Sequence, residues 1–143
     1  MQEFSEAAVR VRYAETDQLG VVYHANYFVW FEVGRVELIR QLGIVYKQME
    51  IDDDCHIVVT EAQCRYERPA RYDDPLRVRT RITEVHTRTI SFAYEIVHEE
   101  TGAMLARGST KHVVCGRNGR PKTLPEKYRK VFSQTSLRAP AYS

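Results

Sequence analysis

Asp17, in a loop just before a predicted helix, is the residue whose type and position best suit chemistry. It lies in ETDQLG, whose Asp and Gly content is typical of a loop, and a helix capped by Asn26 is expected over NYFVWFEVGRVELIRQLG. The first N–H groups of a helix lack intrahelical acceptors, and the helix dipole favours negative charge beside them. A carboxylate near such amides supplies a base or nucleophile together with donors that polarise a carbonyl, as acyl transfer requires. An isolated Asp before a helix is more often a turn or cap residue, and spacing alone does not exclude that role.

His24, Glu32 and Arg35 are the other titratable residues near the expected helix. His24 can act as an acid, a base or an orienting donor, and a hydrogen-bonded loop histidine is at least as good an interpretation. Glu32 and Arg35 lie three residues apart, which favours an ion pair between them over a catalytic Glu32. Core or interface positions are expected for the aromatic residues nearby: Tyr23, Tyr27 and Trp30.

Other kinds of site find less support. Several basic residues could bind phosphates, although charges on exposed strands also prevent edge pairing: Arg77, Arg79, Arg81, Arg88, Lys111 and Arg117. The remaining histidines lack the spacing of metal ligands, so no metal site is expected: His56, His86, His98 and His112. The sequence contains no GxGxxG, GxxxxGK[ST] or GxSxG, which argues against Rossmann binding, nucleotide hydrolysis and serine hydrolase chemistry.

Composition indicates a globular, cytosolic protein. The chain has 143 residues, 43% of them hydrophobic, which predicts one domain with one core over residues 1–133 and a mobile tail over 134–143. Its 21 Lys and Arg against 19 Asp and Glu give a net charge of +2, too balanced for a protein that coats nucleic acid or an anionic membrane. No signal segment and no membrane-spanning apolar run is visible, so stable membrane insertion is not expected and a cytoplasmic location is. Three scattered cysteines indicate reduced structural thiols.

The order of hydrophobic patterns predicts an α+β layout. A first strand is expected over residues 8–14 with Val9, Val11 and Tyr13 on one face, then the long helix ending at Gly43, and then a short helix near residues 45–50. Four strands follow, over residues 57–67, 75–83, 89–98 and 103–115, and a last helix begins at Pro125.

The faces of these elements can also be predicted. The first two of the four late strands should each bury one face, made of Val58, Ala62, Cys64 and Tyr66 in one strand and of Leu76, Val78 and Ile82 in the next. Five consecutive apolar or aromatic residues, 27–31, leave the start of the long helix without a polar face. We therefore expect a curved sheet around this helix, a close contact at Gly34, and a second copy of the chain on the uncovered side.

The stretch YAETDQLGVVYHANYFVWFEVGR, followed by ELIRQLG, resembles hotdog-fold acyl-CoA thioesterases of the 4-hydroxybenzoyl-CoA thioesterase family, especially the bacterial branch associated with the Tol-Pal system. The resemblance extends more loosely to about residue 133. It implies a long central helix wrapped by a curved antiparallel sheet of about five strands, in homodimers whose sheets join and often in tetramers, with active sites between subunits. It also implies hydrolysis of a small or medium acyl-CoA to free acid and CoA, without a cofactor.

The resemblance also assigns roles to residues. Asp17 matches the catalytic carboxylate, which attacks the thioester or activates water, and His24 matches the position whose backbone N–H polarises the carbonyl. Gly20 keeps the loop tight, and Asn26 and Tyr27 hold the turn. The full set expected at the substrate is Gly20, Tyr23, Asn26, Tyr27, Thr60 and Arg88, of which Thr60 would border the acyl pocket and Arg88 the CoA phosphates.

Two other functions remain open at this point. One is a hotdog scaffold that binds acyl carrier protein with little turnover, and the other is a hydratase or dehydratase acting on CoA esters. Release of a thiol distinguishes hydrolysis from both. The preferred acyl group depends on side-chain packing in the pocket and does not follow from the sequence.

Overall fold

The computed structural model of the protein describes residues 4–134, so nearly all of the tail predicted to be mobile lies outside the described residues. One five-stranded antiparallel sheet has the strand order β1-β3-β4-β5-β2. Its strands are β1 (Ser5–Arg10), β2 (His56–Tyr66), β3 (Pro75–Val85), β4 (Thr89–His98) and β5 (Met104–Cys115). The helices are α1 (Asn26–Gln41), α2 (Tyr46–Asp53) and α3 (Glu126–Ser133). This sequence of elements confirms the predicted α+β layout.

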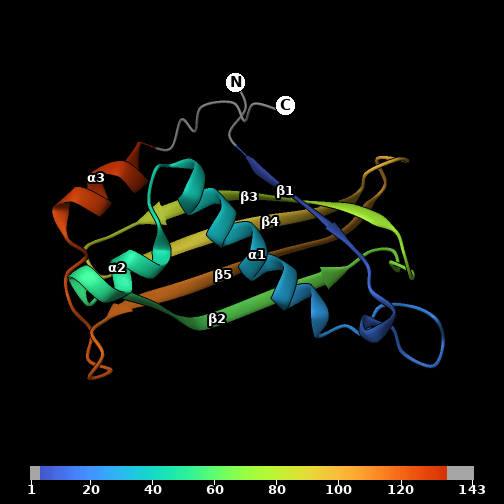
Figure 1. The fold of residues 1–143 in the computed structure, drawn as a ribbon, viewed down its shortest axis with the longest axis horizontal. Coiled ribbons are helices and arrows are strands. Elements are labelled where there is room, and N and C mark those ends of the chain that lie inside the picture. The colour runs from blue at the N-terminus through green and yellow to red at the C-terminus, as the bar shows by residue number, and fades with distance from the viewer. Residues whose placement is uncertain (1–3, 135–143) are drawn as a thin grey trace.

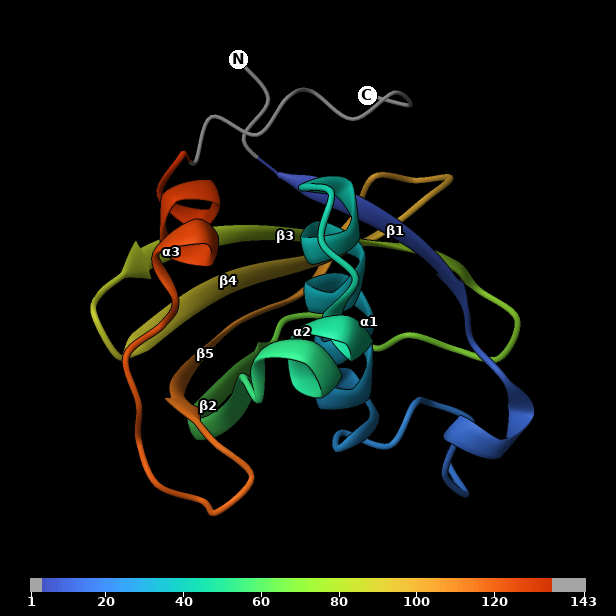
Figure 2. The same ribbon diagram turned by 60° about the vertical axis from the view of Figure 1, so that its left-hand side comes forward.

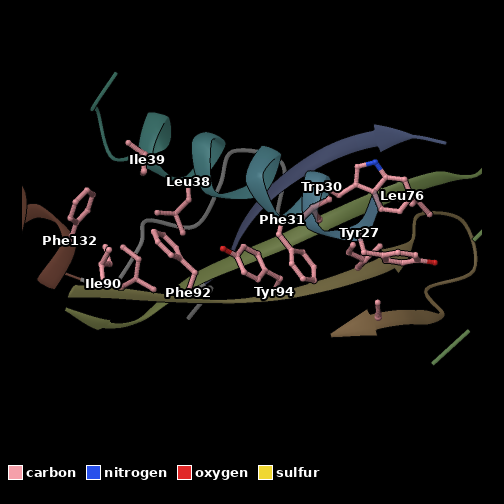
Figure 3. Packing of buried hydrophobic residues seen from close by; sticks show 14 of the residues in the cluster. Tyr27, Trp30, Phe31, Leu38, Ile39, Leu76, Ile90, Phe92, Tyr94 and Phe132 are labelled. Atoms are coloured by element: carbon pink, nitrogen blue, oxygen red, sulfur yellow. The ribbon is translucent and has the colours of Figure 1, made fainter. Parts of the chain in front are cut away.

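Helix α1 lies along the concave side of the curved sheet, and Figures 1 and 2 show the strands passing beneath it. Its apolar residues point down into the sheet, where Phe31 stacks on Tyr94 of β4 with ring centroids 4.3 Å apart. Figure 3 shows side chains of α1 meeting those of β4 along most of the helix. The helix is only partly covered, because Val29 and Val33 remain 50% and 39% exposed. The predicted wrapping therefore holds for the side that faces the sheet.

Gly34 allows this close contact between helix and sheet. A methyl group at Gly34 would overlap Thr80 Oγ1 and would lie 2.8 Å from Val78 Cγ1, both on β3. The prediction that something packs closely against Gly34 is thus confirmed. At the other end of the helix, Gly43 has a φ of +89°, a left-handed conformation that suits glycine just after a helix end, also as predicted.

The alternating pattern of β3 gives the buried face that was predicted, and β4 alternates in the same way. Leu76, Val78 and Ile82 of β3 point into the core, as does the row on β4 that begins with Ile90 and Phe92. Leu76 and Ile96, at the same end of the sheet, are completely buried. A period of two is reliable here because both strands have a neighbour on each side in the sheet.

The prediction for β2 is wrong in two respects. A β-bulge lies between Val59 and Glu61, so Val59 rather than Val58 shares the face of Ala62 that points toward α1. The strand is also an edge of the sheet, and most of its side chains are exposed rather than buried on one face. The extra residue in the bulge is Thr60, which shifted the predicted alternation by one position.

The first strand also differs from its prediction over residues 8–14. β1 ends at Arg10, because the Val11 N–H donates to the Asp74 carbonyl (3.0 Å) and a short 3₁₀ turn begins at Tyr13. Val11 is buried, whereas Tyr13 is 76% exposed, so the two do not share a face. The chain consequently leaves the sheet earlier and has a longer path to the start of α1.

Candidate active site

The loop between β1 and α1 is held by Glu15, a buried carboxylate that sequence analysis did not identify. Its Oε1 accepts a hydrogen bond from the Arg12 backbone N–H (2.8 Å), and its Oε2 accepts one from the Trp30 indole N–H (3.3 Å). The Glu15 carbonyl accepts from the Tyr23 N–H (2.8 Å) and from Asn26 Nδ2 (2.9 Å). Glu15 therefore connects both ends of the loop to the first turns of α1.

Asp17 begins a tight turn within this loop. Its carbonyl accepts from the Gly20 N–H (3.0 Å), and its own N–H donates to the Val21 carbonyl (2.8 Å). Gly20 has a φ of +80°, which fits the expectation that glycine is needed for a tight loop here. The Asp17 side chain is exposed, and its Oδ1 accepts from the Leu19 N–H (2.8 Å). Within residues 4–134, no donor is hydrogen-bonded to Oδ2, which stays available to a reactant.

The start of α1 carries two open amides. The N–H groups of Asn26, Tyr27 and Phe28 donate to the carbonyls three residues before them, at 3.0 to 3.3 Å. Those of His24 and Ala25 have no acceptor in the described part of the chain, as expected for a helix start. The predicted cap is wrong, because Asn26 is already helical, with Ala25 at the cap position, and its side chain binds Glu15 instead.

Asp17 and His24 line the same open groove, which has a volume of about 360 Å³. Tyr27 and Tyr66 form part of its wall, and Arg68 lies at its edge. The Arg68 guanidinium makes no ion pair with any of residues 4–134, and the groove therefore carries a cation free to meet an anionic ligand. This arrangement brings together three predicted residues, namely Asp17, His24 and Tyr27.

Two tyrosines fix the walls of the groove. The Tyr27 hydroxyl accepts from the Ala70 N–H (3.3 Å), and the Tyr66 hydroxyl donates to the His24 carbonyl (3.0 Å). Their rings meet edge to face with centroids 5.0 Å apart. Burial raises the pKa of Tyr66 to about 12 and raises the pKa of Tyr27 as well, so both phenols stay protonated near neutral pH.

Five of the six residues expected at the substrate do not line this groove: Gly20 and Asn26, described above, and Tyr23, Thr60 and Arg88. The ring of Tyr23 lies against that of His24, with centroids 4.4 Å apart. Thr60, in the bulge of β2, donates from Oγ1 to the Lys111 carbonyl (3.1 Å). Arg88 lies in the β3–β4 hairpin, at the opposite end of an eleven-residue strand from the Asp17 loop, or about 30 Å away at roughly 3.3 Å per residue. In a single chain Arg88 therefore cannot reach the groove, and only another subunit could place it there.

A second polar group lies inside the molecule, under the middle of α1. Arg35 Nη1 donates to the Tyr94 hydroxyl (3.1 Å), which is hydrogen-bonded to Thr110 Oγ1. His112 Nε2 lies 2.8 Å from the same Thr110 oxygen, and burial lowers the pKa of His112 to about 3, so its ring is neutral. The predicted ion pair between Glu32 and Arg35 is wrong, because Arg35 turns inward to Tyr94 and no ion pair joins it to Glu32 in residues 4–134.

Nothing in the described residues suggests a metal centre or a membrane span. No three His, Cys, Asp or Glu side chains of residues 4–134 come together as ligands. No helix in that range is long and apolar enough to cross a membrane.

Comparisons with known proteins identify the family of the chain. Residues 11–132 match the family model of the thioesterase-like superfamily. The chain belongs to this superfamily. Within it, the chain is 35% identical over 128 residues to a putative acyl-CoA thioesterase, YneP, of Bacillus subtilis, covering 90% of this chain and 89% of that one. It is 34% identical over 128 residues to the acyl-CoA thioester hydrolase YbgC of Escherichia coli O157:H7, covering 88% of this chain and 93% of that one.

Two solved structures have the same fold as this chain. The DHNA-CoA thioesterase of Staphylococcus aureus superposes with a TM-score of 0.86 at 30% identity, covering 92% of this chain and 89% of that one. A hypothetical protein from Thermus thermophilus superposes with a TM-score of 0.86 at 34% identity, covering 94% of this chain and 99% of that one. The hotdog fold predicted from the sequence, a long helix on a curved antiparallel sheet, is confirmed.

Proposed function

We propose that this thioesterase-like protein hydrolyses the thioester of a small or medium acyl-CoA to free acid and CoA. One observation carries the proposal: the Asp17 carboxylate and the open amide of His24 border one groove at the start of α1. A carbonyl oxygen that accepts from this amide would bring its carbon within reach of Asp17. The relatives named as acyl-CoA thioesterases support the choice of substrate class.

A carboxylate and N–H donors are sufficient for thioester hydrolysis. In one route Asp17 takes a proton from water as the water oxygen attacks the carbonyl carbon, and the N–H donors stabilise the resulting oxyanion. Collapse of the tetrahedral intermediate then breaks the C–S bond, and CoA leaves as a thiolate. In the other route the Asp17 carboxylate attacks directly, and water opens the mixed anhydride that forms. Both routes consume one water and release one acid and one CoA.

Arg68 fits the CoA part of this substrate. CoA carries phosphate groups, and a guanidinium binds phosphate through paired hydrogen bonds. Arg68 borders the groove, whereas the neighbouring Glu67 is already paired with Arg107 at 2.9 Å. The acyl preference, the Tol-Pal association, the cytoplasmic location and acyl carrier protein as a partner stay predictions from the sequence.

The site needs a second subunit to close it, and we place that subunit at β2. This edge strand is eleven residues long, and a long exposed edge readily pairs with another chain. A second cavity, of about 270 Å³, lies between α1 and β2 and is lined by Val29, Val59 and Ala62. A copy of the chain paired with β2 would cover this cavity and provide a site for the acyl group at a homodimer interface. Whether two such dimers form a tetramer stays a prediction.

A thiol-release assay with purified Asp17→Asn tests the proposal. Across acetyl-, hexanoyl- and benzoyl-CoA, kcat should fall at least about 100-fold, the usual effect of removing a catalytic base or nucleophile. His24→Ala should cost less than about tenfold, because the backbone N–H survives. Asp52→Asn, which neutralises an exposed carboxylate on α2, is the matched control and should retain normal turnover.

The possible outcomes separate the functions left open by the sequence. Near-normal turnover by Asp17→Asn would remove Asp17 from the mechanism. Weak activity of the native protein on every acyl-CoA, together with a stable complex with acyl carrier protein, would favour a scaffold. Conversion of an unsaturated acyl-CoA without thiol release would favour a hydratase.

A further inference from the structure

Tyr66 links two segments that are far apart in the sequence but meet at the groove. It is the last residue of β2, and its hydroxyl donates a 3.0 Å hydrogen bond to the carbonyl of His24, 42 residues earlier. The same carbonyl accepts from the Tyr27 N–H (3.3 Å) in the first turn of α1. The His24 carbonyl is thus held by two donors, one from the helix and one from the edge strand.

This carbonyl lies between the two open amides. The His24 N–H precedes it in the chain, and the Ala25 N–H belongs to the same peptide unit. If the His24 peptide rotated, its carbonyl oxygen would present negative charge where the thioester oxygen develops negative charge in the transition state. A hydrogen bond that holds the carbonyl in place prevents this rotation. It also polarises the peptide group between His24 and Ala25, and so strengthens the Ala25 N–H as a donor.

The end of β2 does not depend on this hydrogen bond. Tyr66 pairs with Ala106 of β5 in the sheet register. The next two residues, Glu67 and Arg68, donate their N–H groups to the Leu105 carbonyl at 2.8 and 3.1 Å. The Tyr66 ring also contacts Tyr27 independently of its hydroxyl. The hydroxyl can therefore be removed without taking away the contacts that fix the strand.

From this geometry we infer that Tyr66 is a positioning residue for thioester hydrolysis, acting through the His24 carbonyl to keep the adjacent amides directed at the substrate. The inference rests on the proposed function. The amides act on the thioester carbonyl, which every acyl-CoA has. The contribution of Tyr66 to hydrolysis is therefore the same for every acyl group. A tyrosine that merely borders the acyl pocket would instead act differently on acyl groups of different shape.

Tyr66→Phe, which removes only the hydroxyl, tests the inference in the purified protein. We expect kcat to fall about 5- to 20-fold, since one of the two hydrogen bonds that hold the carbonyl between the open amides is lost, and KM to change less than about twofold. The factor should be the same for acetyl-, hexanoyl- and benzoyl-CoA. Tyr72→Phe removes a hydroxyl from another exposed tyrosine, outside the groove, and serves as the matched control with normal kcat.

Several results would overturn the inference. The first is a kcat of Tyr66→Phe within twofold of the native value. The second is a change in KM without a change in kcat, and the third is a fall in kcat whose size varies with the acyl group. A melting temperature well below that of Tyr72→Phe would also overturn it, because the hydroxyl would then stabilise the fold. Asp17→Asn in the same assay keeps the two proposals apart: if it is inactive while Tyr66→Phe is normal, only the role of Tyr66 fails. If Asp17→Asn is active, the proposed function fails first.

Discussion

Glu15 shows how a single buried side chain can organise the candidate site. Burying a carboxylate is costly unless its oxygens are hydrogen-bonded. Here both oxygens of Glu15 are satisfied, by the Arg12 backbone and guanidinium and by the Trp30 indole, while its side chain is only 6% exposed. The loop that carries Asp17 is thereby fixed to the helix that carries the open amides. The distance between carboxylate and amides thus depends on a residue that itself does not line the groove.

Glu15→Gln should weaken both the fold and the proposed activity. The carbonyl oxygen of the new glutamine side chain can still accept from the Arg12 N–H, but its NH₂ group would then face the Trp30 indole N–H. Both the NH₂ group and the indole N–H would then lack an acceptor. An unsatisfied buried group costs about 1–3 kcal/mol, which thermal or urea unfolding would measure. We also expect a lower kcat on acyl-CoAs. Glu84→Gln, at an exposed position on β3, is the control, and equal stability of the two variants would contradict this role for Glu15.

Some residues of the site could be found from the sequence and others could not. Asp17 and His24 stand in a short contiguous stretch, next to a helix whose start follows from composition and periodicity. Glu15 acts through a contact with Trp30, which is 15 positions later in the chain. Tyr66 acts through a contact with His24, which is 42 positions earlier. No local pattern encodes such contacts, because they depend on how the strands are ordered in the sheet. The position of Glu15 directly before Thr16 and Asp17 was the only feature of the sequence that could have drawn attention to it.

At the scale of elements, the success of prediction depended on the surroundings of each strand. The central strands β3 and β4 have neighbours on both sides, and their alternation matches their burial. The edge strand β2 has the same alternation in sequence, yet the bulge at Thr60 changes which residues face α1, and the missing neighbour leaves them exposed. Hydrophobic periodicity records which face is apolar, but it records neither bulges nor strand order.

The contact between α1 and β3 gives a prediction at this scale. Gly34→Ala should destabilise the protein by about 1–2 kcal/mol, because overpacking against Thr80 and Val78 exceeds the helix propensity gained from alanine. Thr80 Oγ1 is buried without a hydrogen-bond partner among the described residues, so Thr80→Ala removes the closer of the two clashes at small polar cost and leaves the one with Val78 Cγ1. In denaturant unfolding, the double variant should lose less free energy of unfolding than the two single variants lose together, by at least about 1 kcal/mol. Strict additivity would show that the helix can shift away from β3.

At the scale of the whole molecule, the open surfaces lie beside the candidate site. The edge strand β2 and the exposed Val29 of α1 line the cavity between helix and strand. Apolar residues concentrated near a free sheet edge are typical of an interface between copies of a chain. Arg88 would come from the far end of the partner's sheet in such a dimer, which would reconcile its predicted role with its place in a single chain.

Ala62→Lys tests whether the dimer forms through β2 and completes the site. Ala62 lies near the middle of this edge strand, on the face toward α1, and an inward-pointing charge on an edge strand opposes pairing with another chain. In a two-fold dimer the added charges would lie close to each other, which weakens the interface further. Analytical ultracentrifugation should show dimers for the native protein and monomers for the variant, and thiol release should fall as dimers are lost. Gln48→Lys adds the same charge at an exposed position of α2 and should leave both properties unchanged. A variant that is monomeric yet fully active would place the whole site in one chain, and a variant that stays dimeric would move the interface away from β2.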